Sequence, residues 1–342
     1  MKLLNGKFSH RDHRGTEKRR KKEIIPIPDS SPCLCVIREM FLSILIIIAG
    51  MACSRSTGQE PSAFGNKEIN RIISAAPSNT EIIIALGMGD CLIAIDPYSR
   101  NIPGVQASLP EIDFFFPDTE AVIGLEPDLI FVNEINSFGV ADNPFTLLRN
   151  LGIRVIEVPT STSIEGICGD ILFIAETLSA MERGEALVSS MKEEIESIRA
   201  AGEKMPERKS VYFEVSSIPS MVSFGRGTYL NEMIEIAGGQ NIFADEKGWF
   251  SPSAEEIVAR DPELIFTLIY HGVESVSEIM GRRAFENINA VKQNRVFVID
   301  ADSASRPSNN ILGALREMAV AMEAANAPGE AGDPPEEAAG PL

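Results

Sequence analysis

The chain has 342 residues, of which 44% are hydrophobic, and this is enough material for two globular domains. Its formal net charge is −18, but the charge is uneven, because residues 1–52 hold ten of the 31 Lys and Arg and five of the 49 Asp and Glu. Residues 53–342 therefore carry 21 basic against 44 acidic residues, a net charge of −23. A surface this acidic excludes a nucleic-acid partner. It is compatible with a basic partner or a cationic ligand, and its alternative role is to keep the protein soluble.

Residues 1–52 are typical of a targeting leader. A basic run at residues 18–22 precedes an apolar run at residues 41–52, which is too short to span a bilayer and fits the core of a signal peptide. Cys53 follows directly, and residues 50–53, Gly-Met-Ala-Cys, resemble a bacterial lipobox with Gly50 where Leu is usual. We expect Cys53 to be lipidated, residues 53–68 to form a flexible tether, and the protein to be exported and anchored to the outer face of the cytoplasmic membrane. The alternative is a buried helix in an N-terminal domain.

Alternating strand and helix patterns predict an N-terminal lobe over residues 69–162. Four short apolar runs, at residues 71–76, 91–95, 129–133 and 154–158, are separated by helical patterns, the first of which ends at Gly87. Continuous apolar strands that alternate with helices indicate a parallel sheet covered on both faces. Cys91 and Cys168 lie in apolar settings typical of core residues, and the sequence leaves open whether they pair.

One long helix is predicted over residues 163–205, because apolar residues recur there at helical spacing without a proline before Pro206. A second lobe follows over residues 206–326, with strands at 210–215, 264–269 and 295–299 and helices near 229–237, 283–290 and 308–325. Residues 327–342 are rich in Pro, Gly and acidic residues, which predicts disorder. The fold class expected is therefore α/β, with two Rossmann-like lobes of parallel sheet joined by a single long α-helix.

A repeated segment supports two similar lobes. Residues 115–131 and 250–266 are identical at seven of seventeen aligned positions, 135 residues apart. In each copy a proline precedes an N-cap residue, and Glu120 or Glu255 stands two positions after that N-cap. Each glutamate thus lies in the first turn of a short helix, which a second proline ends. Each glutamate stabilises its own helix by about 0.3–1 kcal/mol through the helix dipole. Their matching positions also suggest docking onto a partner with twofold character.

Residues 69–325 resemble the class III solute-binding proteins of ABC importers for vitamin B12, iron–siderophore complexes and haem. The segments that carry the resemblance are, in order, residues 71–96, 117–131, 236–243, 253–266 and 294–302. It implies a monomer that holds its ligand in the cleft between two lobes bridged by a helix. It also implies an ABC permease dimer with a cytoplasmic ATPase as partner, and glutamates that meet arginines of the two permease subunits at Glu120 and Glu255.

The ligand predicted from this resemblance is a corrinoid. Phe114 and Trp249 stand six residues before the two glutamates, where B12-binding members have aromatic residues facing the cleft, and Tyr98 resembles another of their contacts. Asn133 departs from the pattern, since that position is aromatic in the best-known B12 binders, and each aromatic taken alone is more often a core residue. A flat macrocycle would lie against such aromatic walls.

Asp302 and Arg306 match a polar pair that the same members use on the far side of the cleft. No cofactor is expected beyond the bound ligand, which would be a metal chelate such as cobalamin. The alternatives are a ferric siderophore, met by Arg226 and Arg306, or haem with Tyr270 or His271 as axial ligand.

Two other classes of site are disfavoured by the sequence. The only histidines are His10, His13 and His271, and the first two fall in the leader, so a site of several imidazoles for zinc or manganese cannot form. No enzyme is expected: a Rossmann-type enzyme is the remote alternative, but the Gly-x-Gly at residues 87–89 lacks a third glycine and follows a helix instead of a strand.

Overall fold

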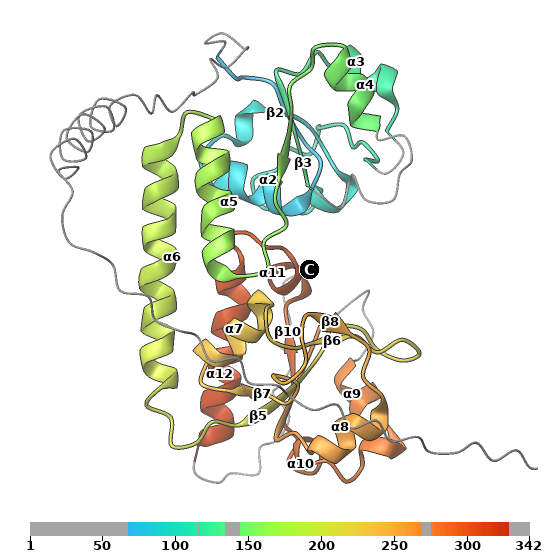
Figure 1. Cartoon of the computed structure of the whole chain (residues 1–342), viewed down its shortest axis with the longest axis vertical. Helices are drawn as coiled ribbons and strands as arrows, with labels where there is room; N and C mark the ends of the chain where they lie inside the picture. Colours follow the sequence, from blue (N-terminus) through green and yellow to red (C-terminus); the bar gives the residue numbers. More distant parts are fainter. Residues whose placement is uncertain (1–67, 115–116, 134–143, 269–274, 328–342) are drawn as a thin grey trace, which may run out of the picture. The chain divides into compact units, whose positions relative to one another are not determined.

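The computed structural model describes residues 68–114, 117–133, 144–268 and 275–327, and residues 67–342 form one compact unit (Figure 1). Cys53 and the rest of the predicted leader, Tyr270 and His271, and the predicted disordered tail beyond residue 327 lie outside the described residues. No helix within the described ranges is long and apolar enough to cross a membrane.

The N-terminal lobe contains a parallel sheet of four strands in the order β2-β1-β3-β4. Short apolar runs become its strands because the sheet lies between two layers of helices; β1 and β3 are almost wholly buried, whereas β4 is partly exposed. The elements are β1 (Ile72–Ser74), α2 (Pro77–Ala85), β2 (Leu92–Ile95), the short 3₁₀ helix η2 (Pro97–Ser99), α3 (Thr119–Gly124), β3 (Leu129–Asn133), α4 (Pro144–Asn150) and β4 (Val155–Val158).

The C-terminal lobe repeats this topology in the strand order β7-β5-β9-β10, again all parallel. In both lobes the first strand lies between the second and third, and the fourth pairs with the third, so the prediction of two similar α/β lobes is confirmed. The elements are β5 (Ser210–Glu214), α7 (Tyr229–Ile236), β7 (Gln240–Asn241), α8 (Ala254–Arg260), β9 (Leu264–Leu268), α9 (Ser275–Met280), η4 (Arg283–Phe285), α10 (Asn289–Lys292), β10 (Val296–Ile299), α11 (Ala301–Ser305) and α12 (Ile311–Asn326).

A small antiparallel pair is added to the C-terminal lobe, and the sequence analysis did not predict it. It is formed by β6 (Ser223–Phe224) and β8 (Trp249–Phe250). The second copy of the repeated segment therefore begins in a strand.

The repeat has the same local structure in both lobes. Asp118 accepts hydrogen bonds from the N–H groups of Glu120 and Ala121 at the start of α3, and Ser253 forms a capping box with Glu256 at the start of α8. Both helices end before their proline at aligned residues in the left-handed conformation, Glu126 with φ of 47° and Asp261 with φ of 44°. The predicted first-turn positions of Glu120 and Glu255 follow from this geometry.

The segment over residues 163–205 was expected to form one long helix with Gly184 as a possible point of interruption, and both parts of this expectation are wrong. The segment forms two helices, α5 (Ile164–Thr177) and α6 (Met181–Gly202), which lie side by side in Figure 1. Ser179, between them, has φ of 56°, which is in the left-handed region. A right-handed helix cannot continue through a residue in that conformation. The turn carries no Gly or Pro, so the sequence offered no breaking signal; Gly184 instead lies inside α6, where a Cβ would come within 2.5 Å of the Ala175 Cβ on α5.

The helix that joins the lobes is α6, about 33 Å long at 1.5 Å per residue. Near its start, Arg183 Nη1 donates to the carbonyl of Gly87, just after α2, over 3.4 Å. Its last residue, Gly202, packs on the turn after α7, where a Cβ would lie 2.8 Å from the nitrogen of Gly238. Gly87 and Gly238 are the matched glycines of the two lobes, so equivalent corners hold the two ends of α6.

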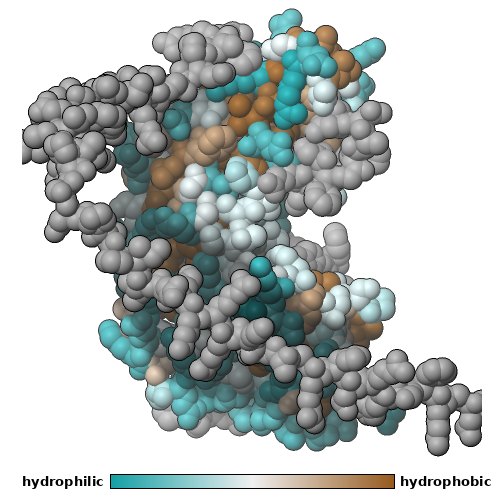
Figure 2. Space-filling view, viewed as in Figure 1, coloured by the Kyte–Doolittle hydropathy of each residue, from teal (hydrophilic) through white to brown (hydrophobic). Residues whose placement is uncertain are grey.

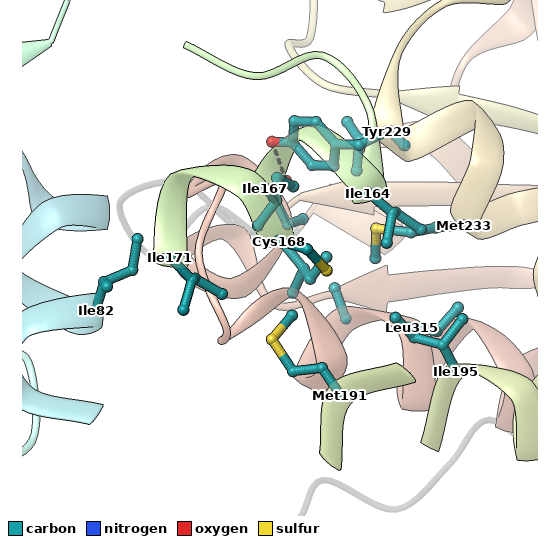
Figure 3. Packing of buried hydrophobic residues seen from close by; sticks show 14 of the residues in the cluster. Ile82, Ile164, Ile167, Cys168, Ile171, Met191, Ile195, Tyr229, Met233 and Leu315 are labelled. Atoms are coloured by element: carbon teal, nitrogen blue, oxygen red, sulfur yellow. Dashed lines mark hydrogen bonds between the residues drawn. The ribbon is translucent and has the colours of Figure 1, made fainter. Parts of the chain in front are cut away.

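One apolar core runs through both lobes along α5 and α6. In Figure 3 the side chains of Ile167 and Cys168 on α5 lie between α7 and α6, and Ile171 points toward Ile82 of α2. The outer faces of the two sheets have cores of their own, closed by α3 and α4 in the N-terminal lobe and by α8, α9 and α10 in the C-terminal lobe. Cys91 and Cys168 are both free thiols.

Candidate ligand-binding site

A cavity of about 520 Å³ lies where the two lobes meet. The N-terminal lobe lines it with segments that follow β1, β2, β3 and β4, so the carboxyl ends of the strands face it, as is usual in open α/β sheets. The C-terminal lobe contributes the start of α7, β8 and the end of α11. Pale residues of near-neutral hydropathy gather between the lobes in Figure 2. The cavity has the size and mixed lining of a small-molecule site.

Trp249 and Tyr98 both line this cavity, one from each lobe. Trp249 is 50% exposed, and its ring meets Phe224 edge to face at 5.6 Å between centroids across the β6–β8 pair. Tyr98 is 71% exposed on η2, where its backbone N–H donates to Asp96 Oδ1 over 2.9 Å. Two large aromatic side chains are thus held at the cavity wall by ordered backbone, and their contact with a ligand stays a prediction.

Phe114 does not line the cavity, so the expectation that it faces the cleft is wrong. It is 2% exposed and stacks on Phe145 of α4 at 6.1 Å, within the core on the outer face of the N-terminal sheet. The aligned Trp249 stays at the surface because it lies on the β6–β8 pair of the C-terminal lobe. Alignment of the repeat matched the backbone positions and not their surroundings.

Arg306 lies at the end of α11 and reaches from the C-terminal lobe to the N-terminal lobe. Its Nη2 pairs with Asp302 Oδ1 over 2.8 Å and donates to the Tyr98 carbonyl over 3.3 Å. Its Nη1 pairs with Glu81 Oε1 of α2 over 3.0 Å. Asp302 and Arg306 therefore form the predicted pair at the cavity, but the arginine is already committed to two carboxylates.

Glu81 of α2 is a site residue that the sequence analysis did not predict. It is 6% exposed, and its other carboxylate oxygen accepts a hydrogen bond from the Ser308 hydroxyl. Burial raises the pKa of Glu81 above its ordinary value, and the bonds from Ser308 and Arg306 offset part of that rise. The matched Glu232 of α7 accepts from the N–H of Ile164 at the start of α5 over 2.9 Å. Each lobe thus uses one glutamate to hold a segment outside its own sheet.

Glu120 and Glu255 lie away from the cavity. Both side chains are exposed, in the first turns of α3 and α8. These helices cover the sheet faces that are turned away from α6, and Figure 1 shows one in each lobe. The two carboxylates are therefore free to meet solvent or a partner surface.

No group of three or more His, Cys, Asp or Glu that could hold a metal ion occurs among the residues that the structure describes. Tyr270, expected as a ligand contact, falls in a stretch outside the described ranges.

Comparison with known proteins gives consistent matches. The family profile described as "Periplasmic binding protein" matches residues 72–303. An uncharacterized ABC transporter substrate-binding lipoprotein, YvrC of Bacillus subtilis, is 32% identical over 261 residues, which are 75% of this chain and 81% of that protein. The vitamin B12-binding protein of Vibrio cholerae is 28% identical over 75% of this chain and 90% of its own. A solved structure of a possible iron-binding periplasmic solute-binding protein from Staphylococcus epidermidis aligns with a TM-score of 0.68 at 29% identity, covering 75% of this chain and 99% of that one.

Proposed function

The chain belongs to the periplasmic binding protein family, and we propose that it is the substrate-binding subunit of an ABC importer for a corrinoid. It captures the ligand between its lobes as a monomer and delivers it to a membrane permease driven by a cytoplasmic ATPase. Lipidation of Cys53 holds it at the outer face of the cytoplasmic membrane, in keeping with the leader pattern and with a lipoprotein among its relatives. The observation that carries the proposal is the cavity between the lobes, walled by Trp249 and Tyr98.

A corrinoid suits this cavity better than an oxygen-rich iron chelate. Aromatic faces stack on a flat macrocycle, and neutral polar groups bond its amide rim. A ferric siderophore needs a cation that is free to meet its oxygens. Of the two arginines predicted for that role, Arg306 is held by Glu81 and Asp302, and Arg226 binds the carbonyls of residues 244–246, outside the cavity lining. Relatives that bind vitamin B12 support the same choice.

Glu120 and Glu255 are proposed as the two contacts with the permease dimer. They are exposed, lie at matched positions of the two lobes, and belong to short helices whose caps fix the first turn. Two like subunits of a permease would present two like basic surfaces, and one carboxylate in each lobe is complementary to them in charge and in number.

Titration of tryptophan fluorescence tests the ligand. Trp249 is the only tryptophan of the chain, so any change in emission reports on the cavity wall. We expect cyanocobalamin and cyanocobinamide to quench it with saturation at micromolar concentrations or below, and calorimetry to give the same affinity. Trp249→Phe removes the signal and serves as the optical control. Unchanged emission together with no heat of binding would exclude a corrinoid, and a ferric siderophore or haem that quenched in the same assay would replace it.

A further inference from the structure

The side chain of Asn79 raises a question that the proposed function leaves unanswered. It lies in the first turn of α2, lines the cavity and is only 1% exposed, yet its Nδ2 has no hydrogen-bond partner within the part of the chain that the structure describes. A buried donor without a partner lowers the stability of the folded state, so proteins rarely keep one without a use for it.

The equivalent helix of the other lobe provides a direct comparison. Asn231 is the third residue of α7, as Asn79 is of α2, and it is 4% exposed. Its Nδ2 donates to Glu235 Oε1 over 2.8 Å, and its Oδ1 accepts from Asn241 Nδ2 over 3.0 Å. Counted from the start of the helix, the third residue is thus an asparagine in both helices. In α7 its Nδ2 and its Oδ1 each have a hydrogen-bond partner, whereas in α2 its Nδ2 has none among the described residues.

The start of α2 has further donors. The backbone N–H groups of Ser78 and Asn79 belong to the first turn, which has no carbonyl of its own helix to bond, and the N-cap residue Ala76 has no side-chain oxygen to accept from them. In α7 the N-cap Thr228 accepts from the Asn231 N–H over 3.3 Å. The first turn of α2 is thus uncapped at the point where it lines the cavity.

Thr160 adds a second unpaired polar group to the same wall. Its Oγ1 is buried without a hydrogen-bond partner among the described residues, and it follows β4 at the cavity. In the sheet, β3 lies between β1 and β4, so the ends of the strands that lead to Asn79 and Thr160 are about 10 Å apart along the carboxyl edge. Asn133, at the end of β3, lines the cavity between them.

We propose that Asn79 and Thr160 form a donor subsite of the N-terminal lobe that hydrogen-bonds oxygen acceptors on the rim of the ligand. The subsite is uncharged, and it takes an amide carbonyl or a carboxylate oxygen; the inference rests on the proposed function. The aromatic residues then hold the face of the macrocycle while this edge reads its substituents. The cost of leaving the donors unbonded in the free protein is recovered when ligand binds.

Binding by variants tests the subsite. With cyanocobinamide, whose rim carries primary amides, we expect Asn79→Ala and Thr160→Val each to weaken binding about tenfold, the loss of one buried hydrogen bond. Asn309→Ala is the matched control, because its Oδ1 is also buried and unpaired in the described structure but does not line the cavity; its affinity should equal that of the wild type. Cobyrinic acid, which carries carboxylates in place of those amides, shows which acceptor is preferred. Wild-type affinity in both subsite variants would overturn the inference.

Thermal unfolding without ligand tests it independently of the ligand's identity. Asn79→Ala should leave Tm unchanged or raise it, because no hydrogen bond is lost, whereas Asn231→Ala should lower Tm by about 4–8 °C. An equal loss of Tm in the two variants would show that Asn79 is bonded structurally and would overturn the subsite. If the wild type binds no corrinoid but the two variants differ in Tm as expected, the corrinoid assignment fails and the spare donor stands.

Discussion

The two lobes share one strand order but close the ends of their first strands with different chemistry. At the end of β5, Glu214 and Arg282 form a buried ion pair with 2.9 Å between Glu214 Oε1 and Arg282 Nη2. At the end of β1, Ser74 instead begins a chain of hydroxyl groups: Thr80 donates to Ser74 over 2.8 Å, and Ser99 donates to Thr80 over 3.0 Å and to Asp96. The same topology therefore accommodates either a buried ion pair at the end of the first strand or a chain of hydroxyl groups that ends at one carboxyl group.

The difference follows the position of the cavity. The carboxyl ends of the N-terminal strands face it, and Asn79, Asn133 and Thr160 from this lobe line it. In the C-terminal lobe, Glu214 and Arg282 do not line the cavity, so a strong ion pair can close that end without facing ligand. Similar backbones thus leave one lobe to bind substituents and the other to supply the aromatic wall of Trp249.

Arg282→Met gives the largest expected effect. The arginine is 9% exposed and also bonds Glu278 and Ser217, so its removal leaves Glu214 buried without its partner. We expect a loss of about 3–5 kcal/mol in the free energy of unfolding, measured by urea denaturation. In the N-terminal lobe, Ser99→Ala removes hydrogen bonds to Thr80 and to the Asp96 carboxyl group but breaks no ion pair, and it should cost about 1–2 kcal/mol. Equal losses in the two variants would remove the distinction between the lobes.

Charge reversal at the docking glutamates tests whether the lobes are equivalent in function. Glu120→Lys and Glu255→Lys should each reduce transport about tenfold, and the double variant should reduce it to background, because in the proposed docking each carboxylate contacts its own permease subunit. Ligand affinity should stay at the wild-type value, since neither residue lines the cavity. Transport is measured with a labelled corrinoid in cells that contain the matching permease.

Glu185→Lys is the control for net charge, because this glutamate is exposed on α6 and belongs to neither repeat. It should transport normally. A loss of ligand affinity in the double variant would contradict the docking role, and an effect of only one of the two single variants would show that the lobes do not dock alike.

The two lobes could be predicted from the sequence because the same sequence signals occur in each of them. Prolines, caps and apolar runs recur around Glu120 and Glu255, and each recurrence predicts the same short helix and buried strand. Asp128 and Glu263, also aligned, both accept hydrogen bonds from backbone N–H groups at the start of the first strand of their lobe. Where several local signals agree in this way, the local structure that they predict is also the one found in the folded protein.

Two other features depended on packing that the sequence pattern does not express. The turn at Ser179 has no breaker residue, and it forms because α5 and α6 bury their apolar stripes against the same core. Phe114 and Trp249 occupy aligned positions, but only the second stays at the surface, since its strand pairs with β6. The spare donor of Asn79 was hidden for a different reason: whether a side-chain amide in the first turn of α2 finds a partner depends on the residues packed around it.

Glu81 of α2 gives the smallest expected effect, which depends on pH. Burial raises the pKa of Glu81 above its ordinary value of 4.5, so the folded protein keeps this proton to a higher pH than the unfolded chain does. The stability contributed by the group is present below pH 4.5 and is lost as pH rises through the raised pKa of the folded state. Because Gln does not titrate, the Tm of Glu81→Gln minus that of the wild type should increase as pH is raised from about 4 to 7.

Two variants sharpen this comparison of the glutamates. Ser308→Ala removes a hydrogen bond that lowers the pKa of Glu81, so the pH range over which the wild-type contribution is lost should move upward. Glu232→Gln weakens the bond to the Ile164 N–H and should cost about 1 kcal/mol at neutral pH. A difference in Tm between Glu81→Gln and the wild type that stays constant from pH 4 to 7 would show that Glu81 does not carry the pH dependence. The buried link between α2 and Arg306 would then be as insensitive to pH in this range as a neutral hydrogen bond.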